Sequence, residues 1–177
     1  MKKIAWAITG GGHFLSECVE ILSKAPQIDL FLSKAGEEVL RIYRLEEKAL
    51  QGRRGIFRDH SASAPIVGRF AKGDYHLLIV APATSNSIAK FALGIADSLV
   101  SNLFSQAGKS RIPIIVLPTD VGEEIDSPAP KGDLVKVYPR KIDLENVKKL
   151  EEFSGVTVVK SVEELERCLN TYLLPES

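Results

Sequence analysis

The residues best suited to ligand chemistry are a polar run, Thr-Ser-Asn-Ser at 84–87, that follows an unbroken apolar run at 77–80. Their hydroxyl and amide groups form hydrogen bonds without adding charge, and they stand where a helix begins and its first N–H groups lack partners. Ala81 and Ala83 let a flat ligand approach the backbone closely. A helix N-cap also uses Ser or Asn, but a cap needs only one such residue. We therefore interpret this segment as the floor of a ligand site.

Three consecutive glycines, at 10–12, form a second candidate binding segment after a short apolar strand. Glycine lets a phosphate approach the backbone, and the helix expected to begin near His13 offers free N–H groups and the positive end of its dipole. The dinucleotide-binding fingerprint is matched only in part, because its third glycine position is Leu15. Asp29 stands at about the distance of the ribose-binding acid, yet it falls inside the second strand. The glycines predict a phosphate site, and NAD(P) is the less favoured ligand.

Other nucleotide, metal and hydrolase motifs are not supported. The Gly-Lys-Ser run at 108–110 lacks the earlier glycine of a P-loop, because that position is Leu103, and a helix rather than a strand precedes it. His13, His60 and His76 have no partner at metal-ligand spacing, so no metal site is predicted. His76 is interpreted as structural, whereas His13 is either a site residue or an ordinary residue at a helix start. No serine has a nucleophile-elbow context.

The elements that must position these residues alternate between strand and helix along the chain. Strands are expected at 4–8, 28–32, 77–80 and 112–117, with later candidates at 134–138 and 156–159. Helices are expected at 14–22, from about Ala35, and from Ser161, where Glu164 completes a capping box. This alternation predicts parallel βαβ units with right-handed crossovers. The expected fold is therefore α/β, a three-layer, doubly wound, mainly parallel sheet.

The candidate residues follow the carboxyl ends of the predicted strands. The first strand ends in residues 9–13, the second in 33–34, the third in 81–87 and the fourth in 118–120. In doubly wound sheets, ligands bind beyond these ends, where the strand order reverses. We therefore expect one site formed by four strand ends.

Composition excludes several classes of partner. The 177 residues are expected to form one domain, 1–177, large enough to bury a core. Lys plus Arg and Asp plus Glu both number 23, so no overall charge favours nucleic acid or an anionic membrane. Cys18 and Cys168 match no metal spacing, and no apolar run has the length of a membrane span. Because nothing resembles a signal peptide, a cytoplasmic protein is expected.

Two segments interrupt the alternation: 44–63, rich in charge, and 119–133, rich in Gly, Pro and acidic residues. Both are expected to run over the surface, as lids or contact loops. Basic residues in and beside the first segment are interleaved with glutamates, which favours a solvated helix face. The alternative is a docking patch for an acidic protein. The basic residues concerned are Arg41, Arg44, Lys48, Arg53, Arg54 and Arg58.

Together, these motifs resemble the FMN-binding flavoprotein superfamily that includes phosphopantothenoylcysteine decarboxylase and lantibiotic cysteine decarboxylases. The resemblance covers roughly residues 3–120. The residues that carry it are Ile-Thr-Gly at 8–10, Ser33, the segment 81–90 and Gly-Ile-Ala-Asp at 94–97. The C-terminal segments 140–147 and 155–159 are similar to archaeal flavoproteins of the ferredoxin-reduced type and to dihydromethanopterin reductase.

The resemblance implies a Rossmann-like flavoprotein fold with a noncovalent FMN. It also implies a homo-oligomer in which the flavin lies near a subunit interface. The cofactor-binding residues that it implies are Thr9, Gly10, Gly12, His13, Ser33, Ala83, Thr84, Ser85, Asn86, Ser87, Asp97 and Ser101. No catalytic residue is assigned.

Two departures separate the chain from the decarboxylases. Their catalytic histidine corresponds to the region 63–65, and the nearest histidine here, His60, is several residues too early. Their Pro-x-Met-Asn-x-x-Met clamp corresponds to 118–124, which reads Pro-Thr-Asp-Val-Gly-Glu-Glu. The predicted function is an FMN electron-transfer flavoprotein or reductase that accepts electrons from a ferredoxin-type donor and passes them to a small acceptor, such as a pterin, or to a protein. The alternatives are a cysteinyl decarboxylase with a displaced base, His60 or His13, and a non-catalytic FMN-binding subunit.

Overall fold

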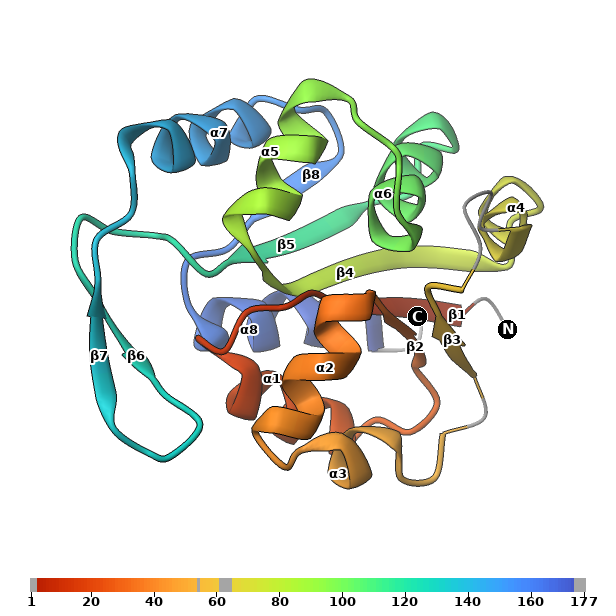
Figure 1. The fold of residues 1–177 in the computed structure, drawn as a ribbon. Coiled ribbons are helices and arrows are strands. Elements are labelled where there is room, and N and C mark those ends of the chain that lie inside the picture. The colour runs from red at the N-terminus through yellow and green to blue at the C-terminus, as the bar shows by residue number, and fades with distance from the viewer. Residues whose placement is uncertain (1–2, 54, 61–64, 174–177) are drawn as a thin grey trace.

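A six-stranded parallel sheet forms the centre of the computed structural model, which describes residues 3–53, 55–60 and 65–173 (Figure 1). The strand order is β3-β2-β1-β4-β5-β8, and every neighbouring pair is parallel. The strands are β1 (Lys3–Ile8), β2 (Asp29–Leu32), β3 (Ile56–Arg58), β4 (Tyr75–Ala83), β5 (Ile114–Pro118) and β8 (Val156–Val158). Because the chain runs outward from β1 in both directions, the predicted doubly wound α/β fold is confirmed.

Helices cover both faces of the sheet, which gives three layers (Figure 1). One face packs against α1 (Leu15–Ser23), α2 (Lys34–Ile42), α3 (Glu46–Leu50) and α8 (Val162–Leu173). The other packs against α4 (Gly68–Ala71), α5 (Ser85–Leu93), α6 (Leu99–Lys109) and α7 (Lys141–Glu151), with a short 3₁₀ turn at Pro65–Val67. Among the described residues, no helix is both long and apolar enough to cross a membrane.

The central strands are apolar because both of their faces are covered. Trp6 and Ile8 of β1 pack into the core on one face, and Ala5 and Ala7 pack into the core on the other. The buried indole of Trp6 donates a hydrogen bond of 2.7 Å to the carbonyl oxygen of Ala81, so its polar atom is satisfied. Strands buried on both faces read as continuous apolar runs, which explains why the sequence revealed them.

Two predictions about the connecting segments need correction. The segment 44–63 is not only a surface excursion, because it contains α3 and the edge strand β3. The strand expected at 134–138 exists as β7 (Leu134–Val137), but it pairs antiparallel with β6 (Ile125–Pro128) in a separate two-stranded sheet. Leu134 is 70% exposed, as expected for a hairpin that stands beside the main core. In Figure 1 this β6–β7 hairpin projects from the molecule at the left.

Asp29 is placed at the amino end of β2, away from the strand ends expected to bind ligand. Its buried carboxylate accepts hydrogen bonds from the Lys3 ammonium at 3.0 Å and from the Tyr75 hydroxyl at 2.8 Å. Burial, together with the hydrogen bond to Asp29, raises the pKa of Tyr75. Asp29 therefore joins the starts of β1, β2 and β4, which excludes the ribose-binding role considered from its spacing.

Candidate functional site

The glycine run at 10–12 forms the turn between β1 and α1, and each glycine lies against a different side chain. Added Cβ atoms on residues 10, 11 and 12 would lie 2.7, 2.5 and 2.1 Å from atoms of Ala35, Thr119 and Tyr43. Protein atoms therefore fill the space that side chains would need. Packing against α2 and the end of β5 is a second reason for glycine here, beside the predicted approach of a phosphate.

Thr9 ties the end of β1 to the end of β4. Its buried hydroxyl donates to the carbonyl oxygen of Pro82 at 2.8 Å and accepts from the N–H of Thr84 at 2.9 Å. The Ala81–Pro82 peptide bond in this segment is cis. Because its hydroxyl proton is engaged, Thr9 acts by positioning the start of α5.

The four predicted polar residues at the start of α5 have different roles. Thr84 is the N-cap, and its hydroxyl oxygen accepts from the N–H of Ser87 at 3.3 Å. The Ser85 hydroxyl donates to the Asp120 carboxylate, and Asn86 is exposed. Ala83, the last residue of β4, is buried and its carbonyl oxygen accepts from Thr119. One residue therefore caps the helix, as the N-cap interpretation requires, while Ser85 and Asn86 serve no capping function.

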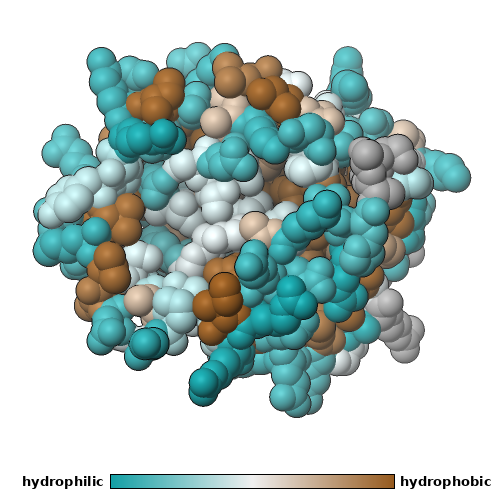
Figure 2. All heavy atoms as spheres, in the orientation of Figure 1, coloured by the Kyte–Doolittle hydropathy of each residue, from teal (hydrophilic) through white to brown (hydrophobic). Residues whose placement is uncertain are grey.

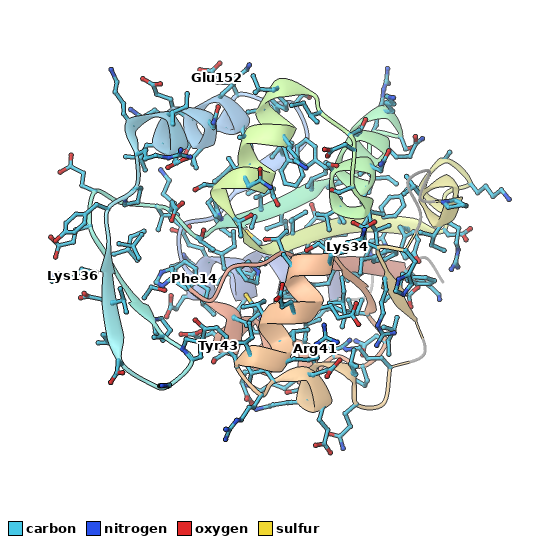
Figure 3. The ribbon with its side chains drawn as sticks, viewed as in Figure 1. Phe14, Lys34, Arg41, Tyr43, Lys136 and Glu152 are labelled. Carbon is cyan, nitrogen blue, oxygen red and sulfur yellow. The ribbon has the colours of Figure 1, made fainter. Side chains whose placement is uncertain are left out.

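Ser33 caps α2, and its hydroxyl oxygen accepts from the N–H of Gly36 at 2.9 Å. Gly36 lies so close to β1 that a Cβ there would be 2.3 Å from the carbonyl oxygen of Ile8. This contact places the start of α2, with Lys34 at its first position, beside the end of β1 (Figure 3). The sequence did not indicate Gly36, because a single glycine in a helix carries no sign of what it touches.

The helices α1, α2 and α5 all begin at the carboxyl edge of the sheet, since each follows a strand directly. The first N–H groups of a helix lack intrahelical partners and carry the positive end of the dipole, which suits an anion. At α1 the N-cap residue is Phe14, whose side chain makes no capping hydrogen bond. Figure 2 shows a pale surface, of intermediate hydropathy, between the starts of α2 and α5. This edge therefore combines free N–H groups with hydroxyl groups.

Asp97 and Ser101 belong to the start of α6. Ser101 is buried and forms a capping box with Ser98, while Asp97 pairs with the Lys90 ammonium at 2.7 Å. The hydrogen bond from Lys90 lowers the pKa of Asp97. The carboxylate of Asp59, after β3, also accepts from the first N–H of α6 at 3.2 Å. In the described residues Ser101 therefore caps α6 and Asp97 forms an ion pair with Lys90, and neither contact involves the glycine run.

His13 and Asp120 are half-buried ionisable residues at this edge. The Nδ1 atom of His13 is buried and has no hydrogen-bond partner in the described part of the chain. Burial lowers the pKa of His13, opposed in part by Glu17 and Asp120. Burial also raises the pKa of Asp120. The sequence indicated Asp120 as a site residue only by its position after the fourth strand. Its hydrogen bond with Ser85 could not be predicted from spacing.

Tyr43 connects α2 to the β6–β7 hairpin. Its ring lies against Gly12, and its hydroxyl donates to the carbonyl oxygen of Pro128 at 2.8 Å. In Figure 3, Tyr43 lies at the side of α2 nearer the hairpin, which carries Lys136. The segment 119–133, expected to be a lid or contact loop, is thus fastened beside the glycine run. No sequence signal marked this contact between residues 85 positions apart.

Arg53, one of the basic residues considered for docking, forms hydrogen bonds with the backbone of the fold. Its guanidinium donates to the carbonyl oxygens of Ala25 at 3.2 Å, Ile28 at 3.0 Å and Leu22, after and at the end of α1. Burial lowers the pKa of Arg53. Arg58 pairs with Glu37 and Lys48 with Glu20, Arg41 and Arg44 are exposed, and Arg54 lies outside the described residues. Arg53 therefore satisfies backbone groups of the fold.

The decarboxylase features remain absent from their expected places. His60 is exposed after β3, where its N–H donates to the carbonyl oxygen of Arg58. Of the region expected to hold the catalytic histidine, residues 63 and 64 lie outside the described part and Pro65 begins the 3₁₀ turn. Asp120 stands within the segment that corresponds to the methionine clamp, so this edge carries a carboxylate where the decarboxylases carry apolar side chains.

Comparisons with known proteins agree with this geometry. The family model described as Flavoprotein matches residues 1–171. Dihydromethanopterin reductase (acceptor) of Methanosarcina mazei is 40% identical over 163 residues, which are 85% of this chain; the chain spans 64% of that relative's length. An uncharacterised protein of Methanocaldococcus jannaschii is 36% identical over 176 residues, covering 96% of this chain and 95% of that protein.

A solved structure is also similar over almost the whole chain. It is DmrB of Burkholderia xenovorans in complex with FMN, described as a cubic protein cage for redox transfer. The two chains are 41% identical and superpose with a TM-score of 0.88, over 97% of this chain and 95% of the other. Similarity of this extent covers all the strand ends described above.

Proposed function

The chain belongs to the Flavoprotein family, and from this membership we propose that it binds FMN and acts as an FMN-dependent reductase. The observation that carries the proposal is the carboxyl edge of the sheet, where three helices begin around a surface of intermediate hydropathy that is rich in hydroxyl groups. The similarity to DmrB, whose structure contains FMN, supports the same ligand.

The residues of this edge fit FMN in chemical type. The starts of α2 and α5, with Ser33 and the polar run at 84–87, offer N–H and hydroxyl groups to a phosphate. Ala81 and Ala83, which were expected to leave room for a flat ring, are instead fully buried in the core, on opposite faces of β4. Bound FMN would supply the redox chemistry, while the protein sets its orientation and exposure.

We also propose an electron donor and an electron acceptor for this reductase. We assign the donor to the ferredoxin type and the acceptor to the pterins. The C-terminal resemblance supports the donor, and the similarity to dihydromethanopterin reductase supports the acceptor. Decarboxylation has less support, because the region of the catalytic histidine and the clamp segment both lack the residues that it needs.

Purified protein is expected to be yellow, with a flavin absorbance spectrum corresponding to one FMN per chain. Under anaerobic conditions a reduced ferredoxin should bleach this spectrum, and a dihydropterin should restore it. Absorbance spectroscopy and single-turnover mixing measure both steps. Colourless protein that also fails to bind added FMN would contradict the proposal, whereas bound flavin that no donor reduces would favour the non-catalytic subunit.

We also propose a homo-oligomer with FMN near the subunit interface. The β6–β7 hairpin and the start of α7 expose large apolar side chains, namely Leu134, Val135, Tyr138 and Ile142. Such side chains beside a site are typical of protein contacts. Light scattering is expected to give a mass of several chains, and Leu134→Lys is expected to lower that mass; a monomeric wild type would contradict the proposal.

A further inference from the structure

Asp120 lies at the edge of the sheet where FMN is proposed to bind. It follows Thr119 at the end of β5, and Thr119 in turn contacts the Gly11 turn and donates its N–H to Ala83 at 2.9 Å. The Asp120 carboxylate accepts the hydrogen bond of Ser85, the first residue of α5. The negative Asp120 carboxylate thus binds the Ser85 hydroxyl, which the sequence had indicated as a group that binds the cofactor.

The charged groups around Asp120 do not neutralise it. His13 faces it from the glycine turn, and burial favours the neutral form of His13. Asp143 and Arg140 face it from the start of α7, but the Arg140 guanidinium makes hydrogen bonds of 2.9 and 2.8 Å to Asp143. Glu17 of α1 lies near His13 and adds further negative charge. Binding of an anion beside Asp120 would therefore favour its protonated form.

An anionic ligand at this edge meets two costs. It must replace the Asp120 carboxylate as the partner of Ser85, and it places its own charge beside an ionised carboxylate. Like charges in one partly buried site disfavour each other, and a proton on one of them removes the repulsion. The N–H groups at the start of α5 attract both anions, so the two compete for the same place.

We propose that Asp120 is a positioning residue that couples FMN binding to the uptake of a proton. In the empty site its carboxylate holds Ser85, and the phosphate of FMN binds to the form in which Asp120 is protonated and has released Ser85. The inference rests on the proposed binding of FMN and adds a residue and a pH dependence to it. Affinity for FMN then falls as the pH rises through the pKa of Asp120.

The test compares the dissociation constants of FMN and riboflavin for apoprotein, wild type and Asp120→Asn, from about pH 5 to 8 by flavin fluorescence. The wild-type constant for FMN is expected to rise by up to about tenfold per pH unit where Asp120 is ionised. Asp120→Asn should bind FMN more tightly and lose this slope, since asparagine still offers Ser85 an acceptor without a charge. The FMN phosphate itself loses a proton at about pH 6. Its contribution to the pH dependence of binding is the same for every variant, so it cancels in the comparison.

Riboflavin and a matched variant are the controls. Riboflavin lacks the phosphate, so its affinity should vary little with pH in either protein. Asp126→Asn removes an exposed carboxylate of the hairpin, paired with Lys136 at 3.7 Å, and should leave the FMN constant and slope unchanged. Far-UV circular dichroism checks that each variant is folded.

Calorimetry of the wild type in two buffers of different ionisation enthalpy measures the proton directly and does not depend on any variant folding. Uptake approaching one proton per FMN above the pKa of Asp120 supports the proposal. Release of a proton, no uptake, or an Asp120→Asn variant with the wild-type constant and slope would overturn it. Failure of FMN to bind at any pH would instead contradict the proposed function.

Discussion

Gly36→Ala is expected to destabilise the protein by about 1 to 3 kcal/mol, the usual cost of overpacking. The added methyl would lie 2.3 Å from the carbonyl oxygen of Ile8 and 3.0 Å from its carbonyl carbon, and backbone atoms cannot rotate away. The start of α2 must therefore shift from β1 and carry Ser33 with it. If the shift of α2 weakens the binding free energy of FMN by about 1.4 kcal/mol, its dissociation constant rises about tenfold. Urea unfolding and flavin fluorescence measure the two effects.

Gly108→Ala is the matched control, because Gly108 also lies inside a helix, α6, and an added Cβ would meet nothing within 4 Å. There the alanine brings only its better helix propensity, so a gain of about 0.5 to 1 kcal/mol is expected. FMN affinity should not change. A Gly36→Ala variant that is stabilised as much as Gly108→Ala would show that α2 is free to move from β1 at no cost.

Thr9→Val is expected to lower the free energy of unfolding by about 2 kcal/mol, because buried groups lose their hydrogen-bond partners. Valine has the shape of threonine, but it leaves the N–H of Thr84 without an acceptor and removes one of the two hydrogen bonds to the carbonyl oxygen of Pro82. These groups hold the start of α5 against β1, so FMN affinity should fall as well. Chemical denaturation and FMN titration of the same preparation measure both.

Thr157→Val is the control for this change. Thr157 is also a strand residue, in β8, but it is exposed, so its replacement should change stability by no more than about 0.5 kcal/mol. Thr9→Ser keeps the hydroxyl and should restore most of the FMN affinity. Equal loss of affinity in Thr9→Ser and Thr9→Val would show that the methyl group, and not the hydrogen bonds, positions α5.

The sheet was largely predictable from sequence, and the strand of it that was missed is the edge strand β3. Central strands β1, β4 and β5 are buried on both faces, so each appears as an apolar run. The edge strand β3 has three partly exposed residues, and its segment is dominated by charge, so it was read as a surface excursion. The strand β7 was found, but its antiparallel partner β6 was not, because pairing depends on where the 119–133 segment folds.

The candidate site was predictable in its location and only partly in its contacts. The glycine run, Ser33 and the polar residues of α5 follow strand ends, and parallel strands bring such ends to one edge. Gly36 and Tyr43 were missed as site residues because their contacts join segments far apart in the chain. Asp120 was placed at the site by its position after the fourth strand, but its contact with Ser85 was not foreseen for the same reason. Arg53, conversely, was interpreted as a surface charge, and the structure shows that its guanidinium donates to four backbone carbonyl groups.

The doubly wound sheet and the kind of ligand that its edge suits follow from the amino-acid sequence, because apolar periodicity and the residues after each strand are local properties. Which polar groups remain for a ligand depends on the folded chain. The Thr9 hydroxyl is engaged between β1 and α5, Ser101 caps α6, and Ser85 is held by Asp120. A side chain's hydrogen bonds depend on neighbours in space, and folding places those neighbours from distant parts of the chain.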